Sequence, residues 1–136
     1  MDGHAALCDF GLSVILDSGP TGFTSSVIGG TLRFVAPERL TEDSGFRSLP
    51  SDVYSYATTY AQIMTGNFPF MWHDTTAAAT ASIIDAIGRG EFPYRIGTIL
   101  SRHDLEFLRL SWDPKPTCRD PSPPCGALGL LPLPRI

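Results

Sequence analysis

The longest stretch with a regular pattern of apolar and polar residues runs from Ser51 to Gly66. Its apolar side chains recur at helical spacing and cover most of the circumference, at positions 53, 56, 57, 60, 61, 63 and 64. No charged residue lies between Val53 and Thr65. We therefore predict a buried helix over residues 51–65, with other elements packed on several sides. Ser51 is the expected N-cap and Gly66 the expected stop.

Two further helices are predicted, over residues 76–88 and 101–110. The first has apolar side chains at positions 77, 81, 84 and 87 and is followed by glycines that end it. The second begins with Ser101 and Asp104 at the spacing of a capping box, in which each side chain bonds the other residue's backbone. The apolar side chains at positions 105, 107 and 108 are expected to face inward.

The rest of the chain reads as one short strand, a short helix and loops. Residues 5–8 form an apolar run that we predict to be a buried strand, with Cys8 as a small core residue. Residues 17–30 are rich in Ser, Thr and Gly and predict a loop. Pro37 is expected in the first turn of a short helix. Seven prolines fall within residues 114–136, which predicts a disordered end.

Composition narrows the class of protein. The 136 residues suffice for one domain, and the net charge of −4 with no basic run argues against nucleic acid or an anionic membrane surface as partner. No apolar run has the length of a membrane span, and the N-terminus has no signal-peptide pattern. Three cysteines without metal-ligand spacing indicate reduced thiols and an intracellular, cytoplasmic protein. His4, His73 and His103 are too scattered for a metal site and are expected at the surface.

Five short motifs then follow one another in a fixed order. They are Asp9-Phe10-Gly11, Gly30-Thr31-Leu32-Arg33-Phe34-Val35-Ala36-Pro37-Glu38, Ser51-Asp52-Val53-Tyr54-Ser55, Gly66-Asn67-Phe68-Pro69-Phe70 and Trp112-Asp113-Pro114-Lys115-Pro116-Thr117-Cys118-Arg119. Each is weak alone, but in this order and spacing the set resembles the eukaryotic protein kinases. The details are most similar to the tyrosine-kinase-like branch of the Ser/Thr enzymes.

The resemblance implies an α+β protein-kinase-like fold, of which this chain holds the mainly α-helical C-terminal lobe in truncated form. It implies a partial kinase domain over residues 1–122, with residues 123–136 as the proline-rich, disordered tail. The activity that it implies for the parent family is ATP-dependent phosphorylation of protein Ser/Thr, with ATP and Mg as cofactors.

The resemblance also assigns residues to the cofactor and to the acceptor. Asp9 resembles the acid that holds Mg²⁺ against the nucleotide phosphates, with Phe10 packed beneath it and Gly11 completing the cofactor-binding motif. Residues 12–35 resemble the activation segment, in which Thr31 would help seat the acceptor hydroxyl.

Three positions resemble the structural residues of the family. Glu38 and Arg119 would pair across the lobe, and Asp52 would bond the catalytic-loop backbone. Two positions depart from the pattern. Phe34 replaces a usual tyrosine, and Asp120 stands where the family has proline, which puts the family's last helix in doubt.

Several parts of the kinase site have no counterpart. Only eight residues precede Asp9, whereas the family places its Gly-rich loop, ATP-pairing lysine and base aspartate before that motif. The single lysine, Lys115, lies between prolines, and the single asparagine, Asn67, lies in an aromatic turn. Residues 102–105, Arg-His-Asp-Leu, are similar to a catalytic-loop motif, but in the wrong order, and we interpret them as a helix start. Tight binding of ATP and Mg by this chain is therefore not expected.

Three hypotheses follow. The first is the C-terminal lobe of a Ser/Thr kinase that cannot transfer phosphate alone and leaves part of residues 51–65 uncovered. The second is a non-catalytic, pseudokinase-like interaction module that uses the surface around residues 66–96 to bind a protein substrate or partner. The third is an enzyme completed by a partner that supplies the small lobe.

Overall fold

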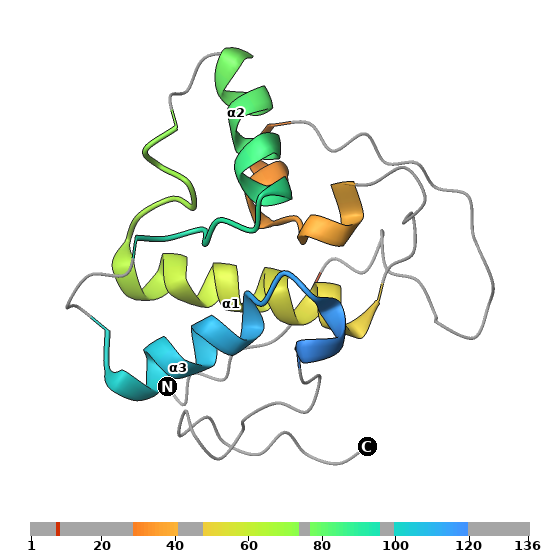
Figure 1. Ribbon diagram of the computed structural model, residues 1–136. Coiled ribbons are helices and arrows are strands. Elements are labelled where there is room, and N and C mark those ends of the chain that lie inside the picture. The colour runs from red at the N-terminus through yellow and green to blue at the C-terminus, as the bar shows by residue number, and fades with distance from the viewer. Residues whose placement is uncertain (1–7, 9–28, 41–47, 74–76, 96–99, 120–136) are drawn as a thin grey trace.

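One long helix organises the part of the chain that the structure describes. The computed structural model describes residues 8, 29–40, 48–73, 77–95 and 100–119. Helix α1 crosses the middle of the molecule, with α3 on one side of it and α2 and two short 3₁₀ helices on the other (Figure 1). The elements are η3 (Gly29–Phe34), η4 (Pro37–Leu40), α1 (Leu49–Thr65), α2 (Ala77–Gly88), α3 (Arg102–Ser111) and η5 (Pro116–Cys118).

Helix α1 begins earlier than the sequence pattern predicted. Its N-cap is Ser48, whose hydroxyl accepts from the Ser51 N–H, so the expectation that Ser51 is the N-cap is wrong. Ser51 instead closes a capping box, because its hydroxyl in turn accepts from the Ser48 N–H. Pro50 fits the first turn, where no helical partner is needed for its missing N–H. The expected stop is confirmed, since Gly66 adopts a left-handed φ of 69° and its N–H donates to the Gln62 carbonyl.

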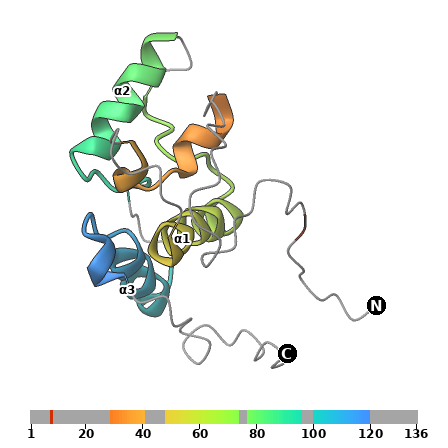
Figure 2. The ribbon, with the colours of Figure 1, turned by 90° about the vertical axis from the view of Figure 1, so that its right-hand side faces the viewer.

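Helix α1 is buried on one side only. Tyr54, Ala57 and Ala61 face the core, together with the small polar residues Ser51 and Thr58. The prediction of burial on several sides is wrong, because large apolar side chains remain exposed; these are Leu49, Tyr56, Ile63 and Met64. The described elements that pack on α1 are α3, η3 and η5, and they leave one side of the helix without a described neighbour (Figure 2).

Helix α3 packs on α1 and forms the first core cluster. Its capping box between Ser101 and Asp104 is confirmed, with Oγ of Ser101 accepting from the Asp104 N–H. Phe107 and Leu108 are buried as predicted, whereas Leu105 is only half-buried. Phe107 meets Tyr60 edge-on, with ring centroids 6.0 Å apart. The buried members of the cluster are Ala36, Tyr54, Ala57, Ala61, Tyr94, Phe107, Leu108 and Trp112.

Helix α2 forms a second cluster with η3 and the turn after α1. The helix starts at Ala77, while Thr76 lies outside the described residues. Of the apolar positions that predicted this helix, Ile87 is buried, whereas Ile84 is 43% exposed and Ala81 is also exposed. The buried residues of this cluster are Leu32, Phe70, Ala79, Ile83, Ala86 and Ile87. The covered face of α2 therefore runs along Ala79, Ile83, Ala86 and Ile87 and not along Ala81 and Ile84.

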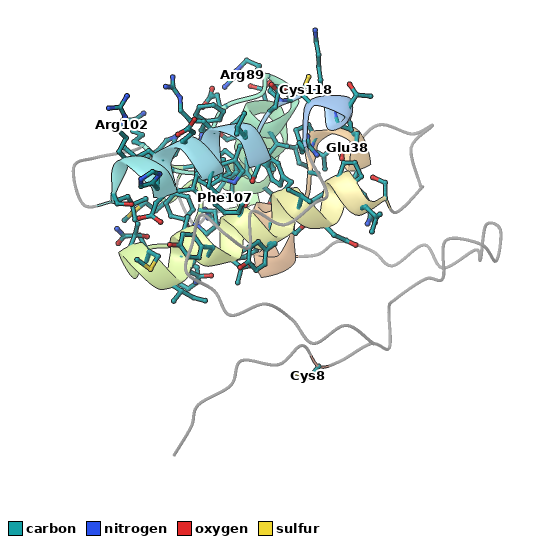
Figure 3. The ribbon with its side chains drawn as sticks, turned by 90° about the horizontal axis from the view of Figure 1, so that it is seen from below. Cys8, Glu38, Arg89, Arg102, Phe107 and Cys118 are labelled. Atoms are coloured by element: carbon teal, nitrogen blue, oxygen red, sulfur yellow. The ribbon has the colours of Figure 1, made fainter. Side chains whose placement is uncertain are left out.

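The predicted strand over residues 5–8 has no support at its one described position. Cys8 is exposed and lies in no regular element, so the expectation of a small core residue is wrong (Figure 3). A strand needs a neighbouring strand to pair its backbone groups, and no strand occurs among the described ranges. Residues 5–7 lie outside them. Within those ranges, no helix is long and apolar enough to cross a membrane.

Gly90 is expected to tolerate alanine less well than Gly66. Both have a positive φ, of 73° and 69°, so alanine costs roughly 1–2 kcal/mol at either position. At Gly90 the new Cβ would also lie 2.8 Å from Cγ of Pro114, whereas at Gly66 it would meet nothing within 4 Å. Urea unfolding of the two variants measures the difference. Equal losses of stability would show that Pro114 moves away without cost.

Candidate functional site: the Glu38–Arg119 pair and the acceptor loop

An ion pair between Glu38 and Arg119 joins two distant parts of the chain. Glu38 follows Ala36 and Pro37 in the first turn of η4, and Arg119 caps η5 at its C-terminal end. The two Nη atoms of Arg119 donate to the two carboxylate oxygens of Glu38, at 2.8 Å and 3.0 Å. This two-pronged geometry is the strongest form that such a pair takes. Glu38 lies beside η5 in Figure 3.

The guanidinium of Arg119 has further partners that hold the surrounding backbone. Its Nε donates to the Asp113 carbonyl at 2.7 Å, and one Nη also reaches the Pro50 carbonyl at 3.3 Å. The group lies over the ring of Tyr54, 5.1 Å from the ring centroid. The side chain of Arg119 is fully buried, and that of Glu38 is 19% exposed. Arg119 therefore ties η4, the start of α1 and the segment after α3 to one point.

The short helix η3, which contains Thr31, is fixed to two other elements. The hydroxyl of Ser55 on α1 donates to the Phe34 carbonyl at 2.8 Å. Nη1 of Arg33 donates to the carbonyls of Pro69 and Phe70, at 2.6 Å and 2.9 Å. The resemblance assigns Thr31 of η3 to seating the acceptor hydroxyl, and we call η3 (Gly29–Phe34) the acceptor loop. The acceptor loop is thus held to both α1 and the turn that follows α1.

The turn after α1 contains a strained residue that Arg33 helps to hold. Phe70 has a φ of 53°, which is costly for a bulky side chain. Its N–H donates to the Pro93 carbonyl at 2.7 Å, and its ring is fully buried. The backbone bonds and the buried ring together offset the strain. This turn presents Phe68 and Met71 to solvent, at 63% and 58% exposure.

A second polar link joins α1 to the start of α3. The hydroxyl of Tyr60 donates to Asp104 at 2.7 Å, and the hydroxyl of Ser101 donates to the other carboxylate oxygen at 2.6 Å. The bonds from Ser101 and Tyr60 hold the pKa of Asp104 below its usual range. Burial and the bond to Asp104 raise the pKa of Tyr60 to about 12.

We expect stability to fall in acid through Asp104. Because its pKa is lower in the folded than in the unfolded chain, its contribution is present above the unfolded value of about 3.9 and is lost as pH falls through the folded value. Asp104→Asn should therefore flatten the decline in the free energy of unfolding below about pH 4. Urea titrations across that range test it. Tyr60→Phe removes the bond from Tyr60 and keeps those from Ser101, so it should give an intermediate slope. An unchanged slope in both variants contradicts the assignment.

The other predicted site residues are only partly placed. Asp9, Phe10 and Gly11 lie outside the described residues, as does the side chain of Thr31, whose backbone belongs to η3. Asp52 lies exposed on the first turn of α1. Residues 102–105 lie in the first turn of α3, which agrees with their interpretation as a helix start.

His73 differs from its expected surface position. The side chain is half-buried, and Nδ1 pairs with the Ser82 hydroxyl at 2.6 Å, while the buried Nε2 has no hydrogen-bond partner. His103 is exposed as expected. No group of three or more His, Cys, Asp or Glu side chains that could hold a metal ion occurs in the described part of the chain.

Three of these interactions were not predicted from sequence. Arg33 and Ser55 lie inside motifs whose other members received roles, but a motif does not indicate which backbone carbonyl a side chain will reach. Tyr60 gave no signal beyond its apolar position on α1. A bond between residues 60 and 104 depends on how α1 and α3 pack, which the pattern of one helix does not contain.

Comparison with known proteins supplies the family. Residues 1–119 match the protein kinase domain family. The chain therefore belongs to the protein kinases, and its helical described part is the C-terminal lobe of that fold.

The relatives are named as Ser/Thr kinases. The chain is 32% identical over 115 residues to the serine/threonine-protein kinase sck2 of Schizosaccharomyces pombe, covering 85% of this chain and 17% of the relative. It is 29% identical over 113 residues to the LRR receptor-like serine/threonine-protein kinase RGI1 of Arabidopsis thaliana, covering 78% and 9%. It is 40% identical over 83 residues to human serine/threonine-protein kinase TNNI3K, covering 60% and 10%.

The chain thus spans less than a fifth of the length of these relatives. No solved structure matches it.

Proposed function

We propose that this chain is the C-terminal-lobe portion of a protein Ser/Thr kinase of the tyrosine-kinase-like branch, and that it does not transfer phosphate alone. The parent activity is transfer of the γ-phosphoryl group of ATP, with Mg²⁺, to a protein hydroxyl. The observation that carries the proposal is the two-pronged pair between Glu38 and Arg119. It joins the two motifs that the family resemblance pairs, 81 residues apart in the chain.

The roles of individual residues follow the same proposal. Asp9 holds the metal ion in the parent enzyme, with Phe10 and Gly11 beside it, and Thr31 seats the acceptor hydroxyl. The anchoring of η3 by Ser55 and Arg33 supports an acceptor loop of fixed position. Glu38 and Arg119 stabilise the lobe, and in the parent enzyme Asp52 bonds the backbone of the catalytic loop.

We expect no phosphate transfer because this chain lacks side chains that kinases use to bind the phosphates and the second metal ion. Kinases place a lysine on the α- and β-phosphates and an asparagine on the second metal ion. The single lysine, Lys115, is exposed just before η5, and the single asparagine, Asn67, is exposed in the turn after α1. Neither belongs to the core of the lobe. Because catalytic groups that act as a unit are not additive, we expect background transfer instead of a slow reaction.

The direct test is transfer of radiolabelled phosphate from ATP to a generic protein acceptor, beside calorimetric titration of the chain with ATP and Mg²⁺. We expect neither transfer above background nor measurable nucleotide binding. Transfer that Asp9→Asn abolishes would overturn the proposal and favour an enzyme completed by a partner that supplies the small lobe. Nucleotide binding without transfer would indicate a nucleotide-sensing module.

A second candidate function is a non-catalytic protein-interaction module that uses residues 66–96. The observation that favours it is the exposure of three large apolar side chains in that region, Phe68, Met71 and Ile84. Phe68 and Met71 lie on the turn after α1 and Ile84 lies on α2, and exposed apolar residues that gather on fixed elements are typical of protein-binding surfaces. Loss of binding to a protein acceptor on Phe68→Ser, with the fold unchanged by circular dichroism, would support this function over the first.

A further inference from the structure

Arg33 joins the acceptor loop to the turn after α1 through a single nitrogen atom. Both bonds to the turn come from its Nη1, which donates to the carbonyl oxygens of Pro69 and Phe70 at 2.6 Å and 2.9 Å. One nitrogen can reach two successive carbonyls only where the chain turns between them, and the left-handed φ of 53° at Phe70 provides that turn. The contact made by Arg33 and the strained backbone of Phe70 therefore depend on each other.

We propose that Arg33 is a positioning residue that fixes the acceptor loop and the turn after α1 as one unit. The acceptor role of the loop rests on the proposed kinase function, whereas the tie between the two segments is a property of this chain alone. In the parent enzyme, the exposed side chains of the turn, Phe68 and Met71, then keep a fixed place relative to Thr31. A protein that reaches both segments meets one defined surface.

The contacts around the loop show why this task falls to Arg33. Phe34 stands where the family has a tyrosine and offers no hydroxyl, and its carbonyl is held to α1 by Ser55 at 2.8 Å. Leu32 of the loop and Phe70 of the turn share one buried cluster, so the two segments stay in contact without any polar bond. Apolar contact is non-directional, whereas a hydrogen bond fixes an orientation. Arg33 therefore sets how the loop and the turn are aligned.

The single-nitrogen contact gives Arg33 a response to substitution that Arg119 does not share. A lysine ammonium carries three donors on one nitrogen, so Arg33→Lys can still bond both carbonyls through a slightly shorter side chain. The fork of Arg119 has no such replacement, because it needs two nitrogens. We therefore expect Arg33→Lys to keep a large part of what Arg33→Met loses.

Amide hydrogen exchange followed by NMR on the full chain provides three reporters. The N–H of Val35 donates to the Leu32 carbonyl at 3.1 Å and reports on the acceptor loop. The N–H of Phe70 donates to the Pro93 carbonyl at 2.7 Å and reports on the turn. The N–H of Trp112, which ends α3, reports on the rest of the lobe. Local opening and global unfolding are distinguished by which of the three amides exchange faster.

Arg33→Met should speed exchange about tenfold or more at both Val35 and Phe70, because bonds from a charged donor are stronger than neutral ones. Ser55→Ala should speed exchange at Val35 only, since it frees the loop from α1 and leaves the turn bound to Arg33. Arg39→Met is the matched control, because it makes the same change on η4 and should leave both amides as they are.

Three results overturn the proposal. Unchanged exchange at Phe70 in Arg33→Met would show that the turn holds itself, and an equal rise at Trp112 would show that Arg33 only stabilises the lobe as a whole. Exchange in Arg33→Lys as fast as in Arg33→Met would show that the two bonds are not what matters. None of these measurements needs ATP, so their failure leaves the proposed kinase function standing, and phosphate transfer by the chain would leave this tie standing.

Discussion

Replacing Arg119 with alanine is expected to lower the free energy of unfolding by about 3–5 kcal/mol, because it leaves the carboxylate of Glu38 without its buried counter-ion. The side chain of Arg119 is fully buried and holds backbone carbonyls as well as Glu38. Loss of these bonds leaves the carbonyl oxygens of Asp113 and Pro50 without the donors that Arg119 supplied, in addition to removing the counter-ion of Glu38. Urea unfolding followed by circular dichroism measures the change.

Arg109→Ala is the matched control for this prediction. Arg109 lies exposed in the last turn of α3, so its removal should change stability by less than about 0.5 kcal/mol. Arg119→Lys should recover little, since an ammonium cannot form the two parallel bonds of a guanidinium. Equal unfolding midpoints for Arg119→Ala and Arg109→Ala would refute a stabilising role for the pair.

A double-mutant cycle separates the pair from its surroundings. Glu38→Met combined with Arg119→Met removes both charges, so no buried charge is left alone, and the combined loss should be smaller than the sum of the two single losses. Additive losses would show that Arg119 acts through Asp113, Pro50 and Tyr54 and not through Glu38.

The sequence predicted the helices well because each has local signals. The period of apolar residues located all three, and Ser101 with Asp104 predicted the cap of α3. The start of α1 was missed because Ser48 and Ser51 are both good cap residues, and the choice depends on the backbone of residue 48, which is extended. Local patterns therefore give the existence of a helix more securely than its first residue.

Burial was predicted less well, since it depends on what packs where. Ile63 and Tyr54 belong to the same apolar helix, yet the first is 75% exposed and the second is 1% exposed. On α2, the adjacent residues Ile83 and Ile84 are 3% and 43% exposed for the same reason. A helix that is apolar nearly all round carries no information on which side its neighbours will cover.

The site was predictable only where a family motif names both partners. The resemblance paired Glu38 with Arg119, and the two side chains lie in contact. Arg33 was not predicted to bind the carbonyls of Pro69 and Phe70, because backbone acceptors look alike in any sequence. A positive φ at a bulky residue such as Phe70 likewise has no sequence signal, since it arises from the packing that offsets its cost.

Trp112→Ala is expected to cost about 3–5 kcal/mol, the usual range for removing a large buried aromatic side chain. Trp112 is 1% exposed and lies in the cluster that joins α1 to α3. Its ring stacks on Tyr94 with centroids 5.9 Å apart and lies 5.8 Å from Phe92. Because α1 and the segment that ends α3 meet at this ring, a cavity here should weaken the whole described core.

Trp112→Phe separates the packing from the hydrogen bond. Nε1 of Trp112 donates to the Thr58 hydroxyl at 3.1 Å, and that hydroxyl still donates to the Tyr54 carbonyl when the indole is gone. The phenylalanine variant should therefore lose only the net value of one bond, about 0.5–1.5 kcal/mol, plus a small packing term. Thr58→Val in the same background should then add less than it does in the wild type.

The chain contains two tryptophans, so the same variants report on their own folding. With Trp112 replaced, the fluorescence comes from Trp72, which packs against Phe70 in the second cluster and lies under the guanidinium of Arg95. If the two clusters unfold together, Trp72 fluorescence and circular dichroism should give one midpoint that shifts with each substitution. A Trp72 midpoint that stays fixed while circular dichroism shifts would show that the cluster around α2 is stable without the one around Trp112, and that Trp112 does not stabilise the lobe as a whole.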